Sequence, residues 1–418
     1  MGEAQNILLT LLFFLETSVL LYLEKKAWNT YYTPLNILSI PFAVVLAVCV
    51  VIEGRWEFVD FHYPVLLIWN IGLLLFAVPS LILAWCLKRA NSPLTDNLSS
   101  IRNDHFHESL FWIGLVLLAA FLYRLYSMRG LFGIIAAEEF ADMYAFHGLW
   151  SHLRMLGLVI MILSIYHLDK KHLHLWILII GFLIVNFVNQ VKGAIIIPCV
   201  TGILMRICTG KTRITIRLLL WILVGAIGVF MMMYIVVPVI LNQSQVGISI
   251  IGFVLKNFCH YLTSGILGLS TDICREMPDK GDFEILFSQF VNIGKTIAGD
   301  QDLLSPVNPF YFTTGLNWTN VRTFFGTILV YSNYVEFALY VLLFSTVMYS
   351  LMIIARKSGD LYSNLIFYIE CGYLAMGWFE FYFFHLQIIE LPIIALLLYL
   401  CYEFIGNHNY GTEKECAV

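Results

Sequence analysis

The chain has 418 residues, of which 60% are hydrophobic and 12% are charged, whereas a typical soluble domain is about 25% charged. Its formal net charge of −4 is spread along the sequence, which excludes the basic stripe of a nucleic-acid-binding protein. Apolar runs of about 20 residues, the length that crosses a bilayer, recur along the chain. The composition therefore predicts an all-α integral membrane protein, a single polytopic helix bundle over residues 1–418.

Hydropathy predicts eleven membrane spans. The first begins at Ile7 and has neither a basic segment before it nor a small-residue cleavage site after it, so we expect a span and not a cleaved signal peptide. In chain order the predicted spans are Ile7–Leu23, Leu35–Ile52, Pro64–Leu87, Leu110–Met128, Leu153–Leu168, Leu173–Val191, Gly193–Cys208, Leu218–Ile240, Tyr334–Ala355, Leu365–Phe384 and Ile388–Ile405.

The distribution of basic residues predicts the orientation. They gather in the odd-numbered connections, for example at Lys25 and Lys26 after the first span and at Lys211 and Arg213 after the seventh. Because cytoplasmic loops carry this excess, the N-terminus is predicted to lie outside and the C-terminus in the cytoplasm. The longest connection, residues 241–322, is then extracytoplasmic.

This large loop has two parts of different character. Ile248–Leu269 is mostly apolar, and we expect a helix at or partly in the membrane interface. The stretch after it holds Asp272, Arg275 and Glu284 among other charges, and we expect it to face water.

Basic residues are scarce on the predicted outer side, and those present are expensive at membrane depth, which makes them functional candidates. They are Arg124, Arg129, Arg154, Lys192 and Arg322. For any single one, pairing with an acid such as Glu380 or Glu390, or snorkelling to the surface, explains it equally well. For the group we predict an anion site, because the local acids are few and the planar donor fork of arginine suits phosphate or diphosphate.

A histidine and an acidic pattern are the other candidates in the loop. His260 lies in the apolar part, and histidine serves as a general base with little tuning of its pKa, although a lone loop histidine is more often structural. Asp300-Gln301-Asp302 has the form of a metal-binding pattern, but three letters are weak evidence, and we interpret it as a solvated loop. No metal and no cofactor are expected.

The stretch Thr319-Asn320-Val321-Arg322-Thr323-Phe324-Phe325-Gly326, at the end of the large loop and before a span, resembles the Thr-Asn-Val-x-Thr signature of Wzy-type oligosaccharide repeat-unit polymerases. Two further stretches look similar to that family. They are Asn189-Gln190-Val191-Lys192-Gly193-Ala194 and His260-Tyr261-Leu262-Thr263-Ser264-Gly265. The predicted number of spans and the position of the large loop also fit it.

The resemblance implies an enzyme of the bacterial cytoplasmic (inner) membrane that builds O-antigen or capsular polysaccharide. It would transfer a growing glycan from polyprenyl diphosphate to a new lipid-linked repeat unit on the outer face, without metal, beside a flippase and a chain-length regulator of the same pathway. Membrane lipid would surround it. Arg322, Lys192 and Arg154 are then expected to bind diphosphate, with Arg124 and Arg129 behind them and Asn320 beside them. His260 is the expected base, and Glu380 is the second choice.

Three other functions stay open. A ligase that moves finished glycan to another acceptor would share the fold and the loop. A flippase or transporter would line its path with the buried charges, but no internal repeat accompanies them. A membrane acyltransferase would need a buried catalytic histidine, for which His385 is the candidate.

Overall fold

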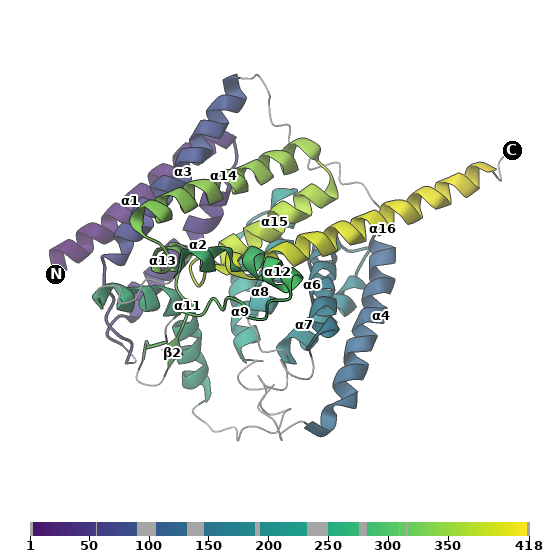
Figure 1. Cartoon of the computed structure of the whole chain (residues 1–418), viewed down its shortest axis with the longest axis horizontal. Helices are drawn as coiled ribbons and strands as arrows, with labels where there is room; N and C mark the ends of the chain where they lie inside the picture. The colour runs from purple at the N-terminus through teal and green to yellow at the C-terminus, as the bar shows by residue number, and fades with distance from the viewer. Residues whose placement is uncertain are drawn as a thin grey trace. The chain divides into compact units, whose positions relative to one another are not determined.

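The computed structural model describes residues 3–55, 57–89, 106–131, 146–188, 193–231, 250–275, 282–308, 310–314 and 317–415. Helices account for most of these residues (Figure 1), and the paired strands among them form a single two-stranded hairpin. The all-α class is therefore confirmed. The chain divides into two compact units, which are described separately: the first comprises residues 1–95, 255–357 and 373–388, and the second the remainder.

Among the residues that the structure describes, six helices are long and apolar enough to cross a membrane. They are α1 (Glu3–Trp28), α2 (Pro34–Ile52), α3 (Val65–Arg89), α4 (Phe106–Ser127), α6 (Leu149–His167) and α14 (Tyr334–Ser358). Shorter apolar helices lie at four further predicted spans. They are α7 (Leu175–Val188), α8 (Gly193–Cys208), α9 (Ile216–Met231) and the apolar first part, Gln387–Cys401, of α16 (Gln387–Glu415). The chain thus has the helices of a membrane-embedded protein, while the count of eleven spans and the orientation stay predictions.

The tenth predicted span, Leu365–Phe384, does not form one helix. Helix α15 (Leu361–Ala375) ends early, and the chain continues through an irregular segment to the short 3₁₀ helix η6 (Tyr382–Phe384). One cause is visible at Gly377, whose carbonyl oxygen accepts a hydrogen bond from the Phe324 amide at 2.6 Å. A carbonyl used by another segment is not available to continue the helix. We call residues 376–386 the post-α15 segment.

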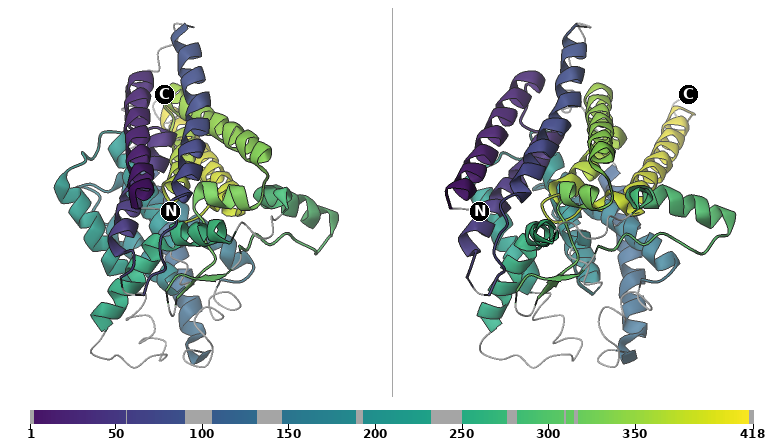
Figure 2. Two further views of the ribbon diagram at one scale, coloured as in Figure 1. Left: turned by 90° about the vertical axis from the view of Figure 1, so that its left-hand side faces the viewer. Right: turned by 60° about the vertical axis from the view of Figure 1, so that its left-hand side comes forward.

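The core of the first unit is built around α1, α2 and α3. Helices α1 and α3 run side by side (Figure 2), and α2 packs on both. The Phe42 and Trp69 rings stack with centroids 3.4 Å apart, joining α2 to α3. Helix α14 joins them through Ser345, whose hydroxyl donates to the Phe76 carbonyl at 2.6 Å. Buried hydroxyl donors in an apolar bundle bond to backbone acceptors, and such a bond fixes which side of a helix is turned toward its neighbour.

The large loop folds onto this core. It contributes α11 (Ile250–Cys274), the 3₁₀ helix η5 (Phe283–Phe287), α12 (Ser288–Ala298), the strands β1 (Tyr311–Phe312) and β2 (Trp318–Thr319), and α13 (Phe324–Val330). The strands are antiparallel, with Tyr311 opposite Thr319. The helix expected over Ile248–Leu269 is therefore present as α11, and its depth in a membrane stays a prediction.

In the second unit α6 is the central helix and packs against α4, α7 and α8. Small residues allow the close approach: a Cβ on Gly157 of α6 would lie 2.7 Å from the Phe182 ring of α7. At the C-terminus of α6, the Arg206 guanidinium donates to the carbonyls of Ile165, Tyr166 and Leu168. A cation at this end satisfies carbonyls that the helix leaves without a partner.

Two glycines let α11 touch other backbone in the first unit. A Cβ on Gly265 would lie 2.8 Å from the Trp378 carbonyl oxygen and closer still to that of Phe379, in the post-α15 segment. A Cβ on Gly268 would lie 2.5 Å from the Val321 carbonyl oxygen. At these two glycines the backbone of α11 therefore lies directly against the backbone of the post-α15 segment and of Val321.

We expect Gly265→Ala to destabilise the purified protein by about 1–3 kcal/mol, because backbone cannot retreat from the added methyl group as a side chain can. Gly252→Ala is the matched control in the same helix, since nothing lies within 4 Å of its Cβ position. Unfolding midpoints in detergent measure both. Equal midpoints for the two variants would show that α11 is not packed this closely.

Candidate functional site

The signature segment, Thr319–Gly326, lies inside the first unit. Thr323 is the N-cap of α13, and its hydroxyl oxygen accepts a hydrogen bond from the Gly326 amide at 3.3 Å. The same oxygen accepts from the Trp69 indole of α3 at 3.1 Å. Capping satisfies an amide at the helix start that would otherwise have no partner. The segment is thus fixed at its C-terminal half by α3.

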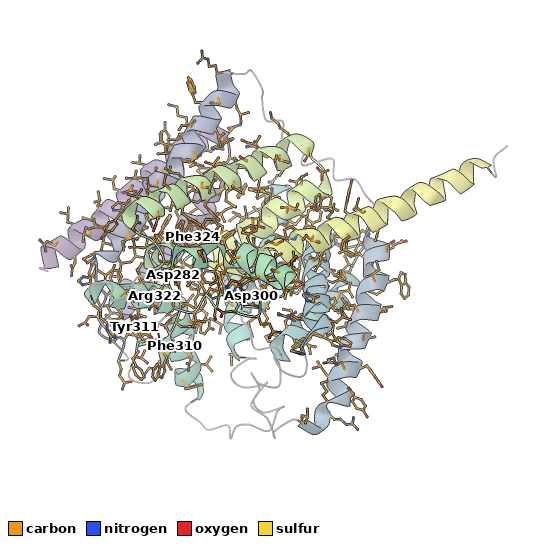
Figure 3. All side chains as sticks on the ribbon, viewed as in Figure 1. Asp282, Asp300, Phe310, Tyr311, Arg322 and Phe324 are labelled. Carbon is orange, nitrogen blue, oxygen red and sulfur yellow. The ribbon has the colours of Figure 1, made fainter. Side chains whose placement is uncertain are left out.

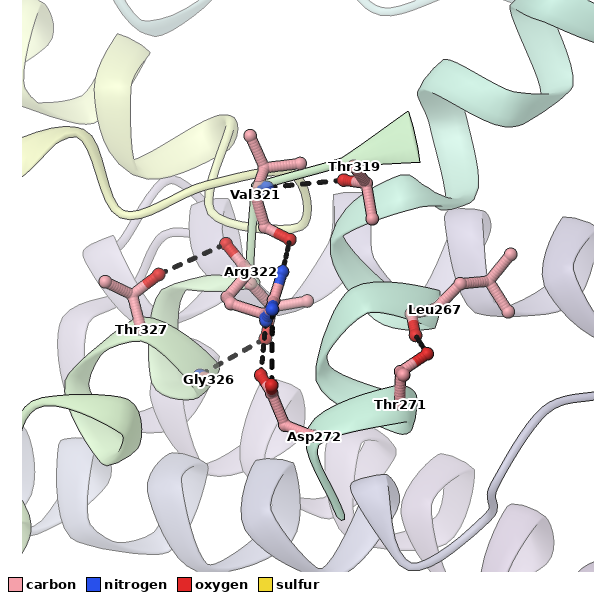
Figure 4. A network of polar contacts seen from close by, with 9 residues as sticks. Leu267, Thr271, Asp272, Thr319, Val321, Arg322, Gly326 and Thr327 are labelled. Atoms are coloured by element: carbon pink, nitrogen blue, oxygen red, sulfur yellow. Dashed lines mark hydrogen bonds and ion pairs between the residues drawn. The ribbon is translucent and has the colours of Figure 1, made fainter. Parts of the chain in front are cut away.

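Arg322 is fully buried and paired with Asp272 of α11 (Figure 4). Its Nε donates to Asp272 Oδ2, its Nη2 donates to Oδ1 at 3.2 Å, and its Nη1 donates to the Val321 carbonyl at 3.0 Å. Such two-pronged contact between arginine and carboxylate fixes both position and orientation. The positive charge of Arg322 is therefore compensated within the protein.

Asp272 is the site residue that the sequence did not identify. The prediction that it faces water is wrong, because the side chain is 6% exposed. A signal was present in the sequence: Gly265, Gly268 and Asp272 follow helical spacing and lie on one face of α11. The two glycines mark where other backbone comes close, and Asp272 extends that face by one turn.

Tyr311 of β1 covers this pair. Its ring centroid lies 4.8 Å from the Arg322 guanidinium and 4.7 Å from that of Arg275, which is exposed (Figure 3 marks Tyr311 and Arg322). Burial raises the pKa of the Tyr311 hydroxyl, and the nearby Asp272 carboxylate adds to the increase. The phenol therefore stays neutral and serves as a lid over a charged pair.

A second tyrosine connects the pair to Glu380. Burial raises the pKa of Tyr331 to about 12; the Arg322 charge opposes this rise, while Glu380 and Asp272 add to it. The Arg322–Asp272 pair and Glu380 thus act on the same hydroxyl group. Glu380 is half-buried in the post-α15 segment, and no hydrogen bond to its carboxylate occurs among the residues that the structure describes.

His260 lies farther away on α11. It is 7% exposed, and its Nδ1 is 2.9 Å from the Thr313 hydroxyl in the turn after β1. Twelve residues separate His260 from Asp272, which corresponds to about 18 Å along the helix axis at 1.5 Å per residue. The expected base is therefore not adjacent to the Arg322–Asp272 pair. Asn320, half-buried after β2, precedes Val321 and Arg322 directly.

The other predicted cations belong to the second unit. Arg124 and Arg154 reach the same aromatic cluster: Arg124 lies 4.7 Å from the Trp150 ring and Arg154 lies 5.7 Å from the Phe146 ring. The Phe121 ring contacts both aromatic rings. These are ordinary cation–π distances in a desolvated place.

The second unit also contains a contact between a histidine and an acid. His152 Nδ1 lies 2.6 Å from Glu390, near the start of α16. Arg129 is exposed; its guanidinium donates to the Tyr126 carbonyl at 2.9 Å and lies over that ring. Lys192 falls outside the residues that the structure describes. A single diphosphate site that gathers these cations with Arg322 stays a prediction.

Within the described ranges, no group of three or more His, Cys, Asp or Glu side chains could hold a metal ion. The Asp300-Gln301-Asp302 pattern forms a turn in which the Asp302 amide donates to the Asp300 carboxylate at 2.9 Å. Lys295 also approaches Asp300, at 3.8 Å. Both acids are exposed, and the Asp300 carboxylate is engaged by these local contacts.

We expect Asp272→Ala to destabilise the protein by about 3–5 kcal/mol, because it leaves the buried Arg322 guanidinium uncompensated. Glu57→Gln is the matched control: it removes the exposed ion pair of Glu57 with Lys256, which also tethers α11, and little change is expected. Equilibrium unfolding in detergent compares the two. Comparable small effects would mean that Asp272 does not hold Arg322 in the folded protein.

No curated protein and no solved structure matches the chain. A family model matches residues 57–405, which include α11, the signature segment and the post-α15 segment. Because the match covers well over half of the chain, the chain belongs to the family of unknown function DUF6337.

Proposed function

We propose that this chain polymerises lipid-linked oligosaccharide repeat units on the outer face of the bacterial cytoplasmic membrane, in O-antigen or capsule biosynthesis. The observation that carries the proposal is the signature segment, Thr319–Gly326, which resembles that of Wzy-type polymerases and which α3 and α11 together hold in place. A membrane enzyme of this kind needs a rigid extracytoplasmic element next to its spans, and the segment leads directly into α13 and α14.

The reaction transfers a glycosyl group. The acceptor hydroxyl oxygen forms a bond to the anomeric carbon, the bond from that carbon to the diphosphate oxygen breaks, and the diphosphate leaves with the electron pair. The acceptor proton passes to a base. The sugar carries positive charge in the transition state, as in glycoside hydrolysis, and the leaving group gains negative charge.

We assign the base to Glu380. A base must be free to accept a proton, and the Glu380 carboxylate is half-buried without a hydrogen-bond partner in the described part of the chain. His260 is more buried, and its Nδ1 is engaged by Thr313. His260 then has a positioning role: it connects α11 to the turn after β1.

We assign Arg322 an electrostatic role that it exerts through Tyr331, since its guanidinium has no exposed surface and does not itself reach the substrate. Its guanidinium is held rigidly by Asp272 and acts on the same Tyr331 hydroxyl as Glu380 does. A charge fixed beforehand needs no reorganisation during the reaction, which is how preorganised groups stabilise a transition state.

We expect Glu380→Gln to reduce polymer formation by about 10²–10⁴-fold, because the variant keeps the shape of the side chain and loses the base. Arg322→Ala is expected to abolish polymer, and in both variants single lipid-linked repeat units should accumulate on the outer face. Glycan length on gels and labelling of outer-face lipid-linked units in intact cells measure these effects.

Glu284→Gln is the control, since Glu284 is an exposed acid of the large loop, and this variant is expected to leave glycan length unchanged. Polymer of normal length from Glu380→Gln at normal protein abundance would remove Glu380 from the mechanism. Repeat units trapped on the cytoplasmic face after deletion of the chain would contradict a polymerase and identify a flippase.

A further inference from the structure

A groove of about 410 Å³ lies between α12 and the end of the post-α15 segment, in the first unit. Its volume falls in the range of small-molecule pockets. Most of its lining is apolar. The apolar residues are Ile293, Ile297, Leu303, Pro306, Phe384 and Leu386.

The walls of the groove are tied together by hydrogen bonds. The Ser288 hydroxyl donates to the Phe384 carbonyl at 3.0 Å and joins the start of α12 to η6. The Asn292 side chain donates to the Leu304 carbonyl at 2.9 Å, and its amide oxygen accepts from the Leu304 amide at 2.8 Å. The Lys295 ammonium donates to the Asp302 carbonyl at 2.6 Å. The groove is therefore preformed, and a ligand would not have to order its walls.

The Thr296 hydroxyl donates to the Asn292 carbonyl at 2.7 Å, which leaves two polar side chains in the lining without a hydrogen bond among the described residues. Gln289 is 6% exposed, and its Oε1 atom is buried with no hydrogen-bond partner. A buried amide without a partner is costly, and each such group in a folded protein calls for an explanation. His385 is half-buried and also lines the groove, and no hydrogen bond to its imidazole occurs among the described residues.

The charge of the lining indicates which kind of ligand group would bond to Gln289 and His385. None of the residues that line the groove is a lysine, arginine, aspartate or glutamate. Burial lowers the pKa of His385 to about 4, so its ring is neutral at neutral pH and offers one donor and one acceptor. A charged headgroup would find no counter-charge here, whereas a hydroxyl group can both donate to Gln289 and bond to His385.

The position of the groove indicates the source of the ligand. Leu386 directly precedes the apolar helix α16, so the groove opens where the chain enters a predicted span. Its apolar lining continues to the surface, since Ile297 is 83% exposed and Leu386 is 45% exposed. A hydrocarbon chain from the bilayer has access to such a surface, and its burial there is favourable.

We propose that this groove binds a membrane amphiphile with an uncharged, hydroxyl-bearing headgroup. Its hydrocarbon chain lies along Ile293 and Ile297 of α12, and its headgroup bonds to Gln289 and His385. The inference rests on the groove alone and does not depend on polymer formation.

The test uses the full chain in phosphatidylcholine nanodiscs and an alkyl glucoside with a photoreactive diazirine in its chain. We expect saturable labelling of peptides that contain residues 288–297 and 384–386. Octyl glucoside should compete for this labelling, whereas octyl sulfate and octyltrimethylammonium should compete at least tenfold more weakly. Gln289→Leu should weaken competition by octyl glucoside about tenfold, the loss expected from one hydrogen bond.

Ile297→Trp fills the groove and should lower the saturable labelling at least tenfold; its exposure means that the larger side chain does not disturb the core. Leu343→Trp is the control on the outer surface of α14, where Leu343 is 57% exposed. Labelling of the groove peptides that rises linearly with probe, or that survives Ile297→Trp unchanged, would overturn the proposal. Equal competition by the charged amphiphiles would overturn the headgroup assignment.

Discussion

The buried pair of Arg322 and Asp272 is the interaction on which the arrangement of the first unit depends. An arginine with no exposed surface is stable only if its charge and its donors are satisfied, and Asp272 and the Val321 carbonyl do both. The pair joins a segment that follows a hairpin to a helix that lies 50 residues earlier. Gly268 allows this contact, because any side chain there would meet the Val321 carbonyl.

The long helices were predictable because their physical signal is local. An uninterrupted apolar run such as α2 or α3 specifies a helix of its own length, and in the described part of the chain the six helices that are long and apolar enough to cross a membrane lie where hydropathy placed them. The interruption of the tenth predicted span was not predictable in this way. Aromatic residues in the post-α15 segment have the hydropathy of a span, but the Gly377 carbonyl is bonded to Phe324, far away in the sequence. Composition does not record a contact of that kind.

The site was predictable in part. Arg322 stands out in the sequence as a cation before a span, and the structure places it at the centre of a unit. Its partner was missed, because Asp272 is followed by other acids, and its helical spacing with Gly265 and Gly268 is the one signal that separates it from Glu284. The predicted anion site assumed that the cations on the outer face have too few acids near them. Counting acids in the sequence does not show which acid lies next to a given cation in the folded chain. The same reasoning shifts the proposed base from His260 to Glu380, which has no such partner in the described chain.

The measurement that tests the central claim most directly is a double-mutant cycle on the pair. It compares the free energies of unfolding of the parent chain, Arg322→Met, Asp272→Leu and the double variant in one detergent. The account predicts that each single variant is strongly destabilised and that the double variant recovers a large part of the loss, because no uncompensated charge remains in the core. Strictly additive effects would contradict it, since they would show that Arg322 and Asp272 do not depend on each other.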